Sequence, residues 1–314
     1  MKVLITGALG QIGSELTLAM RHRYGTANVV CSDIKEECPP GEIAEGVYER
    51  LDVMDPQAIA AAVQRHGVTH MVHLAALLSA VGEARPTLAW EINMGGLFNA
   101  LEVAREAKAA FFTPSSIAAF GPGTPVQLTP QDTIQRPTTM YGVTKVAGEL
   151  LCDYYFLKYG VDTRGVRFPG LISYETLPGG GTTDYAVHIY YEALRQGKYT
   201  SYIDAGTYMD MMYMPDAIAA IINLMEADPH KLTHRNAFNV TAMSFEPEML
   251  AAEIRKHIPA FTIDYQIDPV RQGIANSWPD SLDDSAARAE WGWNPQYDLA
   301  SMTSDMLAKL KGKL

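Results

Sequence analysis

The sequence predicts an α/β fold in which a doubly wound parallel sheet is followed by a smaller, mostly C-terminal lobe. Over the first 170 residues, short and uniformly apolar runs alternate with amphipathic helical patterns, and a glycine-rich turn follows the first run. Strands that are apolar along their whole length are buried on both faces, which is typical of a parallel sheet covered by helices. The length of 314 residues allows one embellished domain or two domains.

The order of the elements follows from the same pattern. Strands are expected at 3–6, 28–33, 47–51, 71–74, 110–114 and 163–168, and helices at 11–22, 56–65, 88–107 and 139–159. After Phe168 the rhythm breaks: the glycines at 179–181 predict a turn, and 185–196, 216–226 and 246–257 look helical. We expect a sheet domain over 1–170 and a lobe over 171–314 that covers the carboxyl ends of the strands, with segments near 205–240 returning to the sheet domain.

The composition excludes several classes of protein. Hydrophobic residues make up 47% of the chain and charged residues 19%, which excludes a disordered, collagen-like or coiled-coil chain. The net charge is -11, and an acidic surface without a basic cluster repels nucleic acid and anionic membranes. No signal-peptide pattern or membrane-spanning run is visible, and Cys31, Cys38 and Cys152 are too irregularly spaced for a disulfide framework or a zinc site. We expect a cytoplasmic protein without a metal site.

A glycine pattern lies between the first expected strand and the first expected helix. Gly7, Gly10 and Gly13 follow one another at intervals of three residues. Glycines here permit a tight turn and close approach of the backbone to a pyrophosphate, and the helix N-terminus supplies N–H donors. Asp33, twenty residues after Gly13, suits the ribose hydroxyls of an adenosine and would repel a 2′-phosphate, so the pattern predicts NAD and a Rossmann-type sheet. The alternative is an ordinary glycine-rich turn.

A tyrosine and a lysine share one face of a predicted helix. Tyr141 and Lys145 are four residues apart, which places their Cβ atoms about 5–6 Å from one another. The ammonium would stabilise a Tyr141 phenolate, which can remove a proton from an alcohol. Ser116, after the fifth strand, is suited to orient the same oxygen, with Ser115 as the neighbouring candidate. A solvated helix face and a serine that caps the following turn are the alternatives.

These three elements together resemble the extended short-chain dehydrogenase/reductase family. The matching motifs are Gly-x-x-Gly-x-x-Gly, the serine and Tyr-x-x-x-Lys, within about the first 170 residues. The resemblance implies that Tyr141 is the catalytic base, that Lys145 also holds the nicotinamide ribose, and that Asn93 completes a proton relay. It further implies a homodimer through helices 89–107 and 139–159, for which packing of both helices onto their own sheet is the alternative.

Beyond residue 120 the sequence is similar to short-chain L-threonine 3-dehydrogenases, a branch of that family. The matching stretches are 134–137, 167–170, 178–187, 239–245, 271–279 and 291–293, of which 178–187 is the most discriminating. The resemblance implies NAD-dependent oxidation of the 3-hydroxyl of L-threonine to 2-amino-3-ketobutyrate, and metabolic coupling to an acyltransferase that consumes this product. Thr182 and Thr183, with Ser79, would hold the carboxylate or ammonium of the substrate, although both threonines also suit a helix N-cap.

The expected site follows from these motifs and from the resemblance. The expected catalytic residues are Ser116, Tyr141 and Lys145, and the substrate contacts are Ser79, Ser116, Tyr141, Thr182 and Thr183. Asp52 suits the adenine amino group, while Ala75 and Ala76 let the dinucleotide lie against the backbone, although such residues also occur as plain strand ends. The full set of expected cofactor contacts is Gly7, Gly10, Gln11, Ile12, Gly13, Asp33, Asp52, Val53, Leu74, Ala75, Ala76, Asn93, Tyr141, Lys145 and Leu171.

Two other functions would use the same scaffold. A nucleotide-sugar epimerase or dehydratase would need a pocket for a nucleoside diphosphate, and a dehydratase would need an acidic pair where Ile117 and Ala118 follow Ser116. A non-catalytic NAD sensor would need the glycines but not the serine, tyrosine and lysine.

Overall fold

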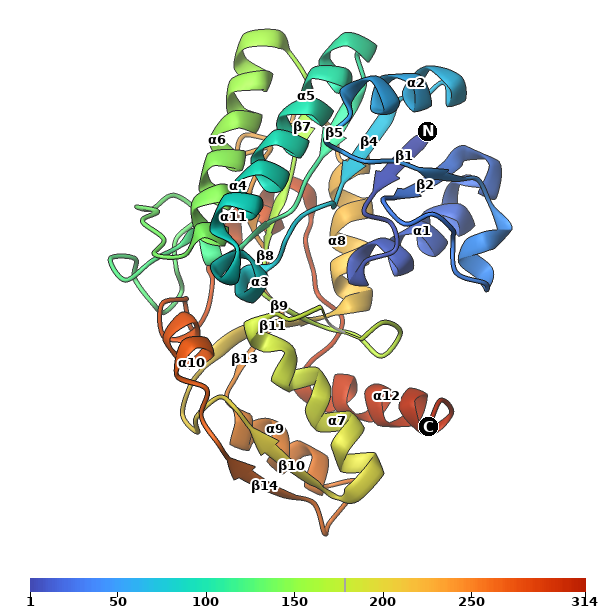
Figure 1. Cartoon of the computed structure of the whole chain (residues 1–314). Coiled ribbons are helices and arrows are strands. Elements are labelled where there is room, and N and C mark those ends of the chain that lie inside the picture. The colour runs from blue at the N-terminus through green and yellow to red at the C-terminus, as the bar shows by residue number, and fades with distance from the viewer. Residues whose placement is uncertain (178) are drawn as a thin grey trace.

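Six parallel strands form the central sheet of the computed structural model, which describes residues 1–177 and 179–314 (Figure 1). Pro178, at the start of the 178–187 stretch, lies outside the described residues. The strand order is β3-β2-β1-β4-β5-β7, which confirms the doubly wound Rossmann-type sheet. The order reverses between β1 and β4, where open α/β sheets bind ligands. The strands are β1 (Val3–Thr6), β2 (Val29–Asp33), β3 (Tyr48–Arg50), β4 (His70–His73), β5 (Ala110–Phe112) and β7 (Thr163–Arg164).

Helices cover both faces of this sheet. Val3 and Ile5 belong to the core that contains the buried residues of α1 and α8, and Leu4 belongs to the core of α2, α5 and α6. Side chains alternate across a strand, so a strand between two helical layers must be apolar at every position. This explains the uniformly apolar runs in the sequence. The helices are α1 (Gln11–Tyr24), α2 (Pro56–His66), α5 (Gly96–Ala107), α6 (Met140–Tyr159) and α8 (Met214–Glu226).

Two expected elements are each divided in the structure. The helix expected at 88–107 consists of α4 (Pro86–Trp90), a π-helical turn over Glu91–Gly95 and α5. The strand expected at 163–168 separates at Gly165 into β7 and β8 (Val166–Phe168). A Cβ atom on Gly165 would lie 2.5 Å from the Thr113 carbonyl oxygen, so this position accepts only glycine. Beyond it β8 leaves the six-stranded sheet and pairs with β6 (Ser115–Ser116) and β12 (Phe238–Asn239).

The second half of the chain builds most of the lower lobe (Figure 1). The helices expected at 185–196, 216–226 and 246–257 are present as α7 (Tyr185–Gln196), α8 and α9 (Pro247–Arg255). Of these, α8 does not join the lobe, because it packs on the sheet domain beside α1 (Figure 1). The remaining strands are β9 (Gly170–Ile172), β10 (Lys198–Ser201), β11 (Met209–Tyr213), β13 (Met243–Phe245) and β14 (Thr262–Tyr265). The remaining helices are α3 (Ser79–Ala84), α10 (Pro269–Ala275), α11 (Ser285–Trp291) and α12 (Leu299–Lys311).

None of the helices in the described ranges combines the length and the apolar composition that crossing a bilayer requires. The three cysteines are free, and Cys31 and Cys152 are buried.

A buried arginine attaches α8 to the edge of the sheet. The Arg164 guanidinium donates to the carbonyl oxygens of Leu224, Met225 and Ala227, at 2.6, 3.1 and 2.8 Å. These carbonyls lie at the C-terminal end of α8, where the regular donors of the next helical turn are missing, and that of Leu224 also accepts the Ala227 N–H at 3.3 Å. The same guanidinium forms an ion pair with Asp162 at 2.8 Å. Arg164 therefore supplies donors that the end of α8 would otherwise lack.

Arg164→Ala should lower the free energy of unfolding by about 2–4 kcal/mol, because it leaves buried carbonyl groups without donors. Denaturant unfolding measures this change. Arg23→Ala is the control, since Arg23 pairs with Glu226 on the same helix but is half exposed, and it should change stability far less. Equal effects of the two substitutions would contradict this account of Arg164.

Candidate active site

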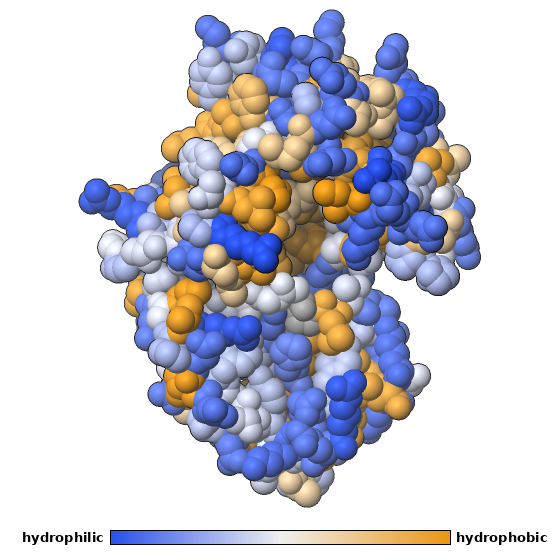
Figure 2. All heavy atoms as spheres, viewed as in Figure 1, coloured by the Kyte–Doolittle hydropathy of each residue, from blue (hydrophilic) through white to orange (hydrophobic). Residues whose placement is uncertain are grey.

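A cleft of about 1100 Å³ opens at the carboxyl ends of the strands, between the sheet domain and the lobe. Figure 2 shows that the surface is hollowed between these two parts of the molecule. Elements far apart in the sequence contribute to its walls: the glycine loop, the start of α6, the turn after β6 and the segment before α7. The expected site residues in its lining are Gly7, Gly10, Gln11, Ile12, Gly13, Leu74, Ala76, Ser79, Ser116, Tyr141, Lys145, Leu171, Thr182 and Thr183.

The glycine loop forms a cradle that side chains would fill. Gly7 has φ of 70°, and a Cβ atom there would lie 2.7 Å from the Ala75 backbone nitrogen. A Cβ atom on Gly13 would lie 2.4 Å from the Gly7 carbonyl oxygen. Asp33 Oδ2 accepts the N–H of Leu9 at 3.1 Å, so the carboxylate at the end of β2 also fixes the loop. The loop and the N-terminus of α1 fit the pyrophosphate of a dinucleotide.

Asp33, described above, does not line the cleft. The same is true of four other expected cofactor contacts: Asp52, Val53, Ala75 and Asn93. Asp52 is exposed and its Oδ1 accepts the Met54 N–H at 2.9 Å, and Val53 is buried against Gly96. Ala75 and Asn93 line a smaller cavity that shares Leu74, Ala76, Pro114, Ser115 and Lys145 with the cleft. The Asn93 amide is already bonded to the backbone of Leu77, at 2.8 and 3.1 Å, and to Thr144 at 3.2 Å. It ties the π-helical turn to the loop after β4 and to α6.

The start of α6 rests directly on the turn that follows Ser116. The Thr139 hydroxyl caps the helix by accepting the Gly142 N–H at 3.1 Å. A Cβ atom on Gly142 would lie 2.2 Å from the Ala118 carbonyl oxygen, so the helix approaches that turn backbone to backbone. This contact places Tyr141 and Ser116 on the same cleft.

Lys145 is the charged neighbour of Tyr141. Its Nζ lies 5.3 Å from the centre of the Tyr141 ring and donates to the Pro114 carbonyl oxygen at 2.7 Å. His73, buried behind it, has its pKa lowered to about 3 by desolvation and by the Lys145 charge. The imidazole is therefore neutral at physiological pH, and Lys145 supplies the positive charge at this position.

The two neighbouring serines have different partners. Ser116 Oγ accepts the Ala118 N–H at 3.2 Å, which leaves its own O–H available to donate into the cleft. Ser115 Oγ instead donates to the buried carboxylate of Glu149. The turn-capping role and the substrate role of Ser116 are therefore compatible, and the geometry favours Ser116 over Ser115 as the serine that meets a ligand.

The lobe presents a buried hydroxyl to the cleft. Thr182 is fully buried, and its Oγ1 has no hydrogen-bond partner among the described residues. It does not cap the following helix, because its Oγ1 accepts no backbone N–H there. The Asp184 carboxylate accepts the N–H groups of Gly180 and Gly181, at 3.0 and 2.7 Å. Burial raises the pKa of Asp184, although these N–H groups act in the opposite direction. A buried hydroxyl without a partner is costly, so this one points to a ligand.

Several residues of the cleft carry no motif of their own. They are Leu78, Pro114, Ile117, Phe168, Pro169, Gly170, Gly181, Asp184 and Trp278. Phe168 and Trp278 fall in the stretches 167–170 and 271–279, which carry the resemblance but no assigned role. The sequence also did not predict the contacts between α1 and the segment after β9. Ser173 donates to Glu15 at 2.5 Å, and burial raises the pKa of the Glu15 carboxyl to about 7. No local pattern announces such contacts, because the partners are more than 150 residues apart.

The part of the chain that the structure describes contains no group of three or more His, Cys, Asp or Glu residues placed to hold a metal ion.

Comparison with known proteins assigns the chain to a family. Residues 3–241 match the model of the NAD dependent epimerase/dehydratase family. The chain belongs to this family. The family match and the structural neighbours confirm the resemblance to extended short-chain dehydrogenases/reductases and NAD as the cofactor.

Individual relatives cover almost the whole chain. An uncharacterized epimerase/dehydratase of Staphylococcus haemolyticus is 61% identical over 99% of this chain and 98% of its own. The X-ray structure of an L-threonine dehydrogenase from Clostridium difficile is 60% identical with a TM-score of 0.97, over 99% of this chain and 98% of that one. The holo form of a GalE-like L-threonine dehydrogenase from Cupriavidus necator is 52% identical with a TM-score of 0.95, over 99% and 100% of the two chains.

Asp33→Ala should raise the affinity for NADPH relative to NADH by about tenfold, because it removes a negative charge next to the expected 2′-phosphate position. Fluorescence titration of both cofactors measures the ratio. The ratio is the right quantity, since loss of the Leu9 contact weakens both cofactors together. Asp52→Ala is the control, because adenine is common to both. An unchanged ratio in Asp33→Ala would place the ribose contact elsewhere.

Proposed function

We propose that the protein oxidises the 3-hydroxyl of L-threonine with NAD, forming 2-amino-3-ketobutyrate and NADH. The observation that carries the proposal is the cleft itself, which joins the glycine cradle, the Ser116, Tyr141 and Lys145 set and the free hydroxyl of Thr182. The likeness to L-threonine dehydrogenases over the whole chain supports the choice of substrate.

The side chains around the reacting hydroxyl have distinct tasks. Tyr141 removes the proton of the 3-hydroxyl, and the nearby Lys145 ammonium stabilises the phenolate that performs this step. Ser116 donates its free O–H to the substrate oxygen and holds it beside Tyr141. Bound NAD supplies the acceptor for the hydride that leaves C3. The glycine cradle at Gly7 and Gly13 would hold its pyrophosphate.

The charged ends of the amino acid would meet the lobe side of the cleft. Thr182 and Thr183 lie there, and Ser79, the first residue of α3, also lines the cleft. These hydroxyls would bind the carboxylate or the ammonium of the substrate. The buried Asp184 carboxylate stays with the Gly180 and Gly181 N–H groups and holds the two threonines in place.

The remaining proposals concern the surroundings of the enzyme. An exposed apolar strip crosses α5 and α6 and includes Phe98, Leu150, Tyr154 and Leu157, of which the last three follow helical spacing along one face of α6. We propose that a second copy of the chain covers it.

The product and the compartment are further parts of the proposal. The 2-amino-3-ketobutyrate product would pass to an acyltransferase. A reducing cytoplasm suits the three free cysteines.

Purified protein with NAD should form NADH in the presence of L-threonine. The Tyr141→Phe variant should bind NAD normally but lose turnover by about 10³-fold or more, because the proposed base is absent. Absorbance at the NADH band measures turnover. Serine and UDP-galactose are the substrate controls. Interconversion of the nucleotide sugar without net NADH would indicate an epimerase, and a Tyr141→Phe variant with full turnover would remove the base assignment.

Thr182→Val should raise KM for L-threonine by about tenfold and leave the affinity for NAD unchanged, because it removes one hydroxyl contact to substrate while keeping the side-chain volume. Steady-state kinetics at saturating NAD measure this effect. Thr303→Val is the matched control: Thr303 is a buried threonine of the same lobe whose hydroxyl lies 2.8 Å from that of Tyr190. A KM change of equal size in both variants would argue against a substrate contact at Thr182.

A further inference from the structure

The short strand β6 places two adjacent serines on opposite sides. Ser116 lines the cleft, whereas the buried Ser115 donates to Glu149 on α6. In the pairing of β6 with β8, Ser115 lies opposite Arg167 and Ser116 opposite Phe168. Side chains alternate along strands, so Ser115 and Arg167 share one face and Ser116 and Phe168 the other. Ser115 also contributes to the lining of the cleft, but its hydroxyl is bonded to Glu149, and the site described above assigns a role to Ser116 alone.

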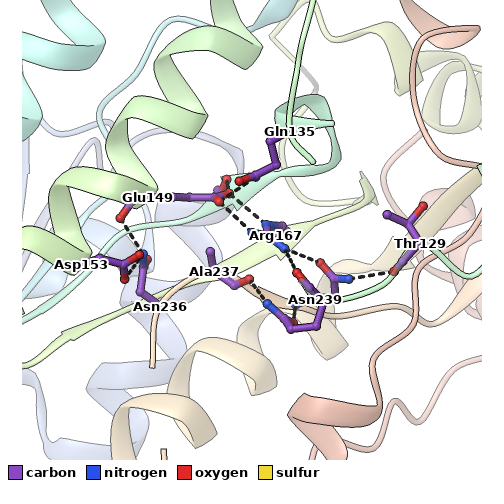
Figure 3. A network of polar contacts seen from close by, with 10 residues as sticks. Thr129, Gln135, Glu149, Asp153, Arg167, Asn236, Ala237 and Asn239 are labelled. Carbon is purple, nitrogen blue, oxygen red and sulfur yellow. Dashed lines mark hydrogen bonds and ion pairs between the residues drawn. The ribbon is translucent and has the colours of Figure 1, made fainter. Parts of the chain in front are cut away.

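Glu149 and Arg167 form a buried ion pair on the first face. Figure 3 shows the two side chains facing one another from α6 and β8. Arg167 donates through Nε and Nη2 to the two carboxylate oxygens, at 3.0 and 2.8 Å, and both side chains are less than one-tenth exposed. Gln135 donates to the same carboxylate at 2.8 Å.

Both donors on Nη1 of this arginine are also satisfied. Arg167 Nη1 donates to the Gln131 carbonyl oxygen at 2.8 Å and to Asn239 Oδ1 at 3.1 Å (Figure 3). The guanidinium is therefore held in one orientation by three segments of the chain, and it holds the Glu149 carboxylate in one orientation in turn.

A buried ion pair is a poor source of stability, because desolvation of the two charges offsets most of their attraction. Its geometry is nevertheless strict, since a bidentate pair permits one arrangement of its partners. Here the arrangement extends to the catalytic strand. Lys145 donates to the Pro114 carbonyl oxygen, and one helical turn later Glu149 accepts from Ser115. Thus α6 holds the two residues that immediately precede Ser116.

We propose that Ser115, Glu149 and Arg167 form a positioning triad that sets the Ser116 hydroxyl relative to Tyr141 and Lys145. None of the three is assigned to contact substrate or cofactor. This proposal rests on the proposed function in one respect: the oxidation of L-threonine is the reaction in which the effect of the triad on rate is measured. Ser115 is the member that links the ion pair to the catalytic strand, so its hydroxyl is the one to remove.

Ser115→Ala should lower kcat for L-threonine by about tenfold, with KM and the affinity for NAD changed by less than about twofold, because small displacements of a catalytic group reduce rate more than binding. Activity is expressed per NAD-binding site, so unfolded protein does not contribute. The primary isotope effect with L-threonine deuterated at C3 should rise, because the chemical step becomes slower relative to the others.

Thr163→Ala is the matched control. Thr163 is fully buried, and its hydroxyl donates to α6 at the Cys152 carbonyl oxygen, 3.0 Å away. It lies on β7, which pairs with β5 and belongs to a different sheet from β6. Both variants lose one buried hydrogen bond to the same helix, so both should lose similar thermal stability, but Thr163→Ala should keep kcat within about twofold and its isotope effect unchanged. Equal kcat values or equal isotope effects in the two variants would overturn the proposal.

A second measurement requires no substrate. A crystal structure of Ser115→Ala should show the Ser116 Oγ displaced by about 0.5 Å or more relative to Tyr141, the tolerance within which catalytic groups must be held. An unmoved Ser116 would overturn the triad even if L-threonine proved not to be the substrate. Conversely, wild-type protein that makes no NADH from L-threonine, together with a displaced Ser116 in the variant, would overturn the proposed function alone.

Discussion

The contact between α6 and the β6 strand with its following turn is the constraint on which the rest of the site depends. Gly142 brings the two backbones together at Ala118, and Lys145 and Glu149 then bind Pro114 and Ser115 at successive turns of the helix. Without the glycine, the helix would stand away from the turn, and Tyr141 could not share an oxygen with Ser116. One helix therefore supplies the proposed base and its cation and also fixes the strand that carries the serine.

The parts of the fold that depend on local pattern could be predicted from the sequence. The apolar strands, the glycine loop and the four-residue spacing of Tyr141 and Lys145 each express a rule that acts within a few residues. The division of the last strand at Gly165 could not be predicted in this way, because its cause is the Thr113 carbonyl more than fifty residues earlier.

The same distinction separates the cofactor half of the site from the substrate half. The cofactor cradle is made of backbone, and its sequence signature is therefore the absence of side chains at Gly7 and Gly13. The proposed substrate half is made of side chains brought together by the fold. Thr182 reaches the cleft from the lobe, and Trp278 reaches it from the segment after α10. Their roles follow from burial and from the partners available, which sequence spacing does not contain.

The segment 173–176, directly after β9, links the lobe side of the cleft to the sheet domain. Ser173 donates to Glu15 and Thr176 contacts Ser14 at 3.0 Å, so the segment is attached to the first turns of α1, directly after the glycine cradle. At its other side Glu175 pairs with Lys313 near the end of the chain. Residues 173–176, which follow the cleft-lining Leu171, are thus fixed to the same helix whose start would hold the pyrophosphate. Residues of the lobe that bind substrate can serve a reaction at the sheet only if the lobe keeps its position relative to the sheet domain. These side-chain contacts help to maintain that position.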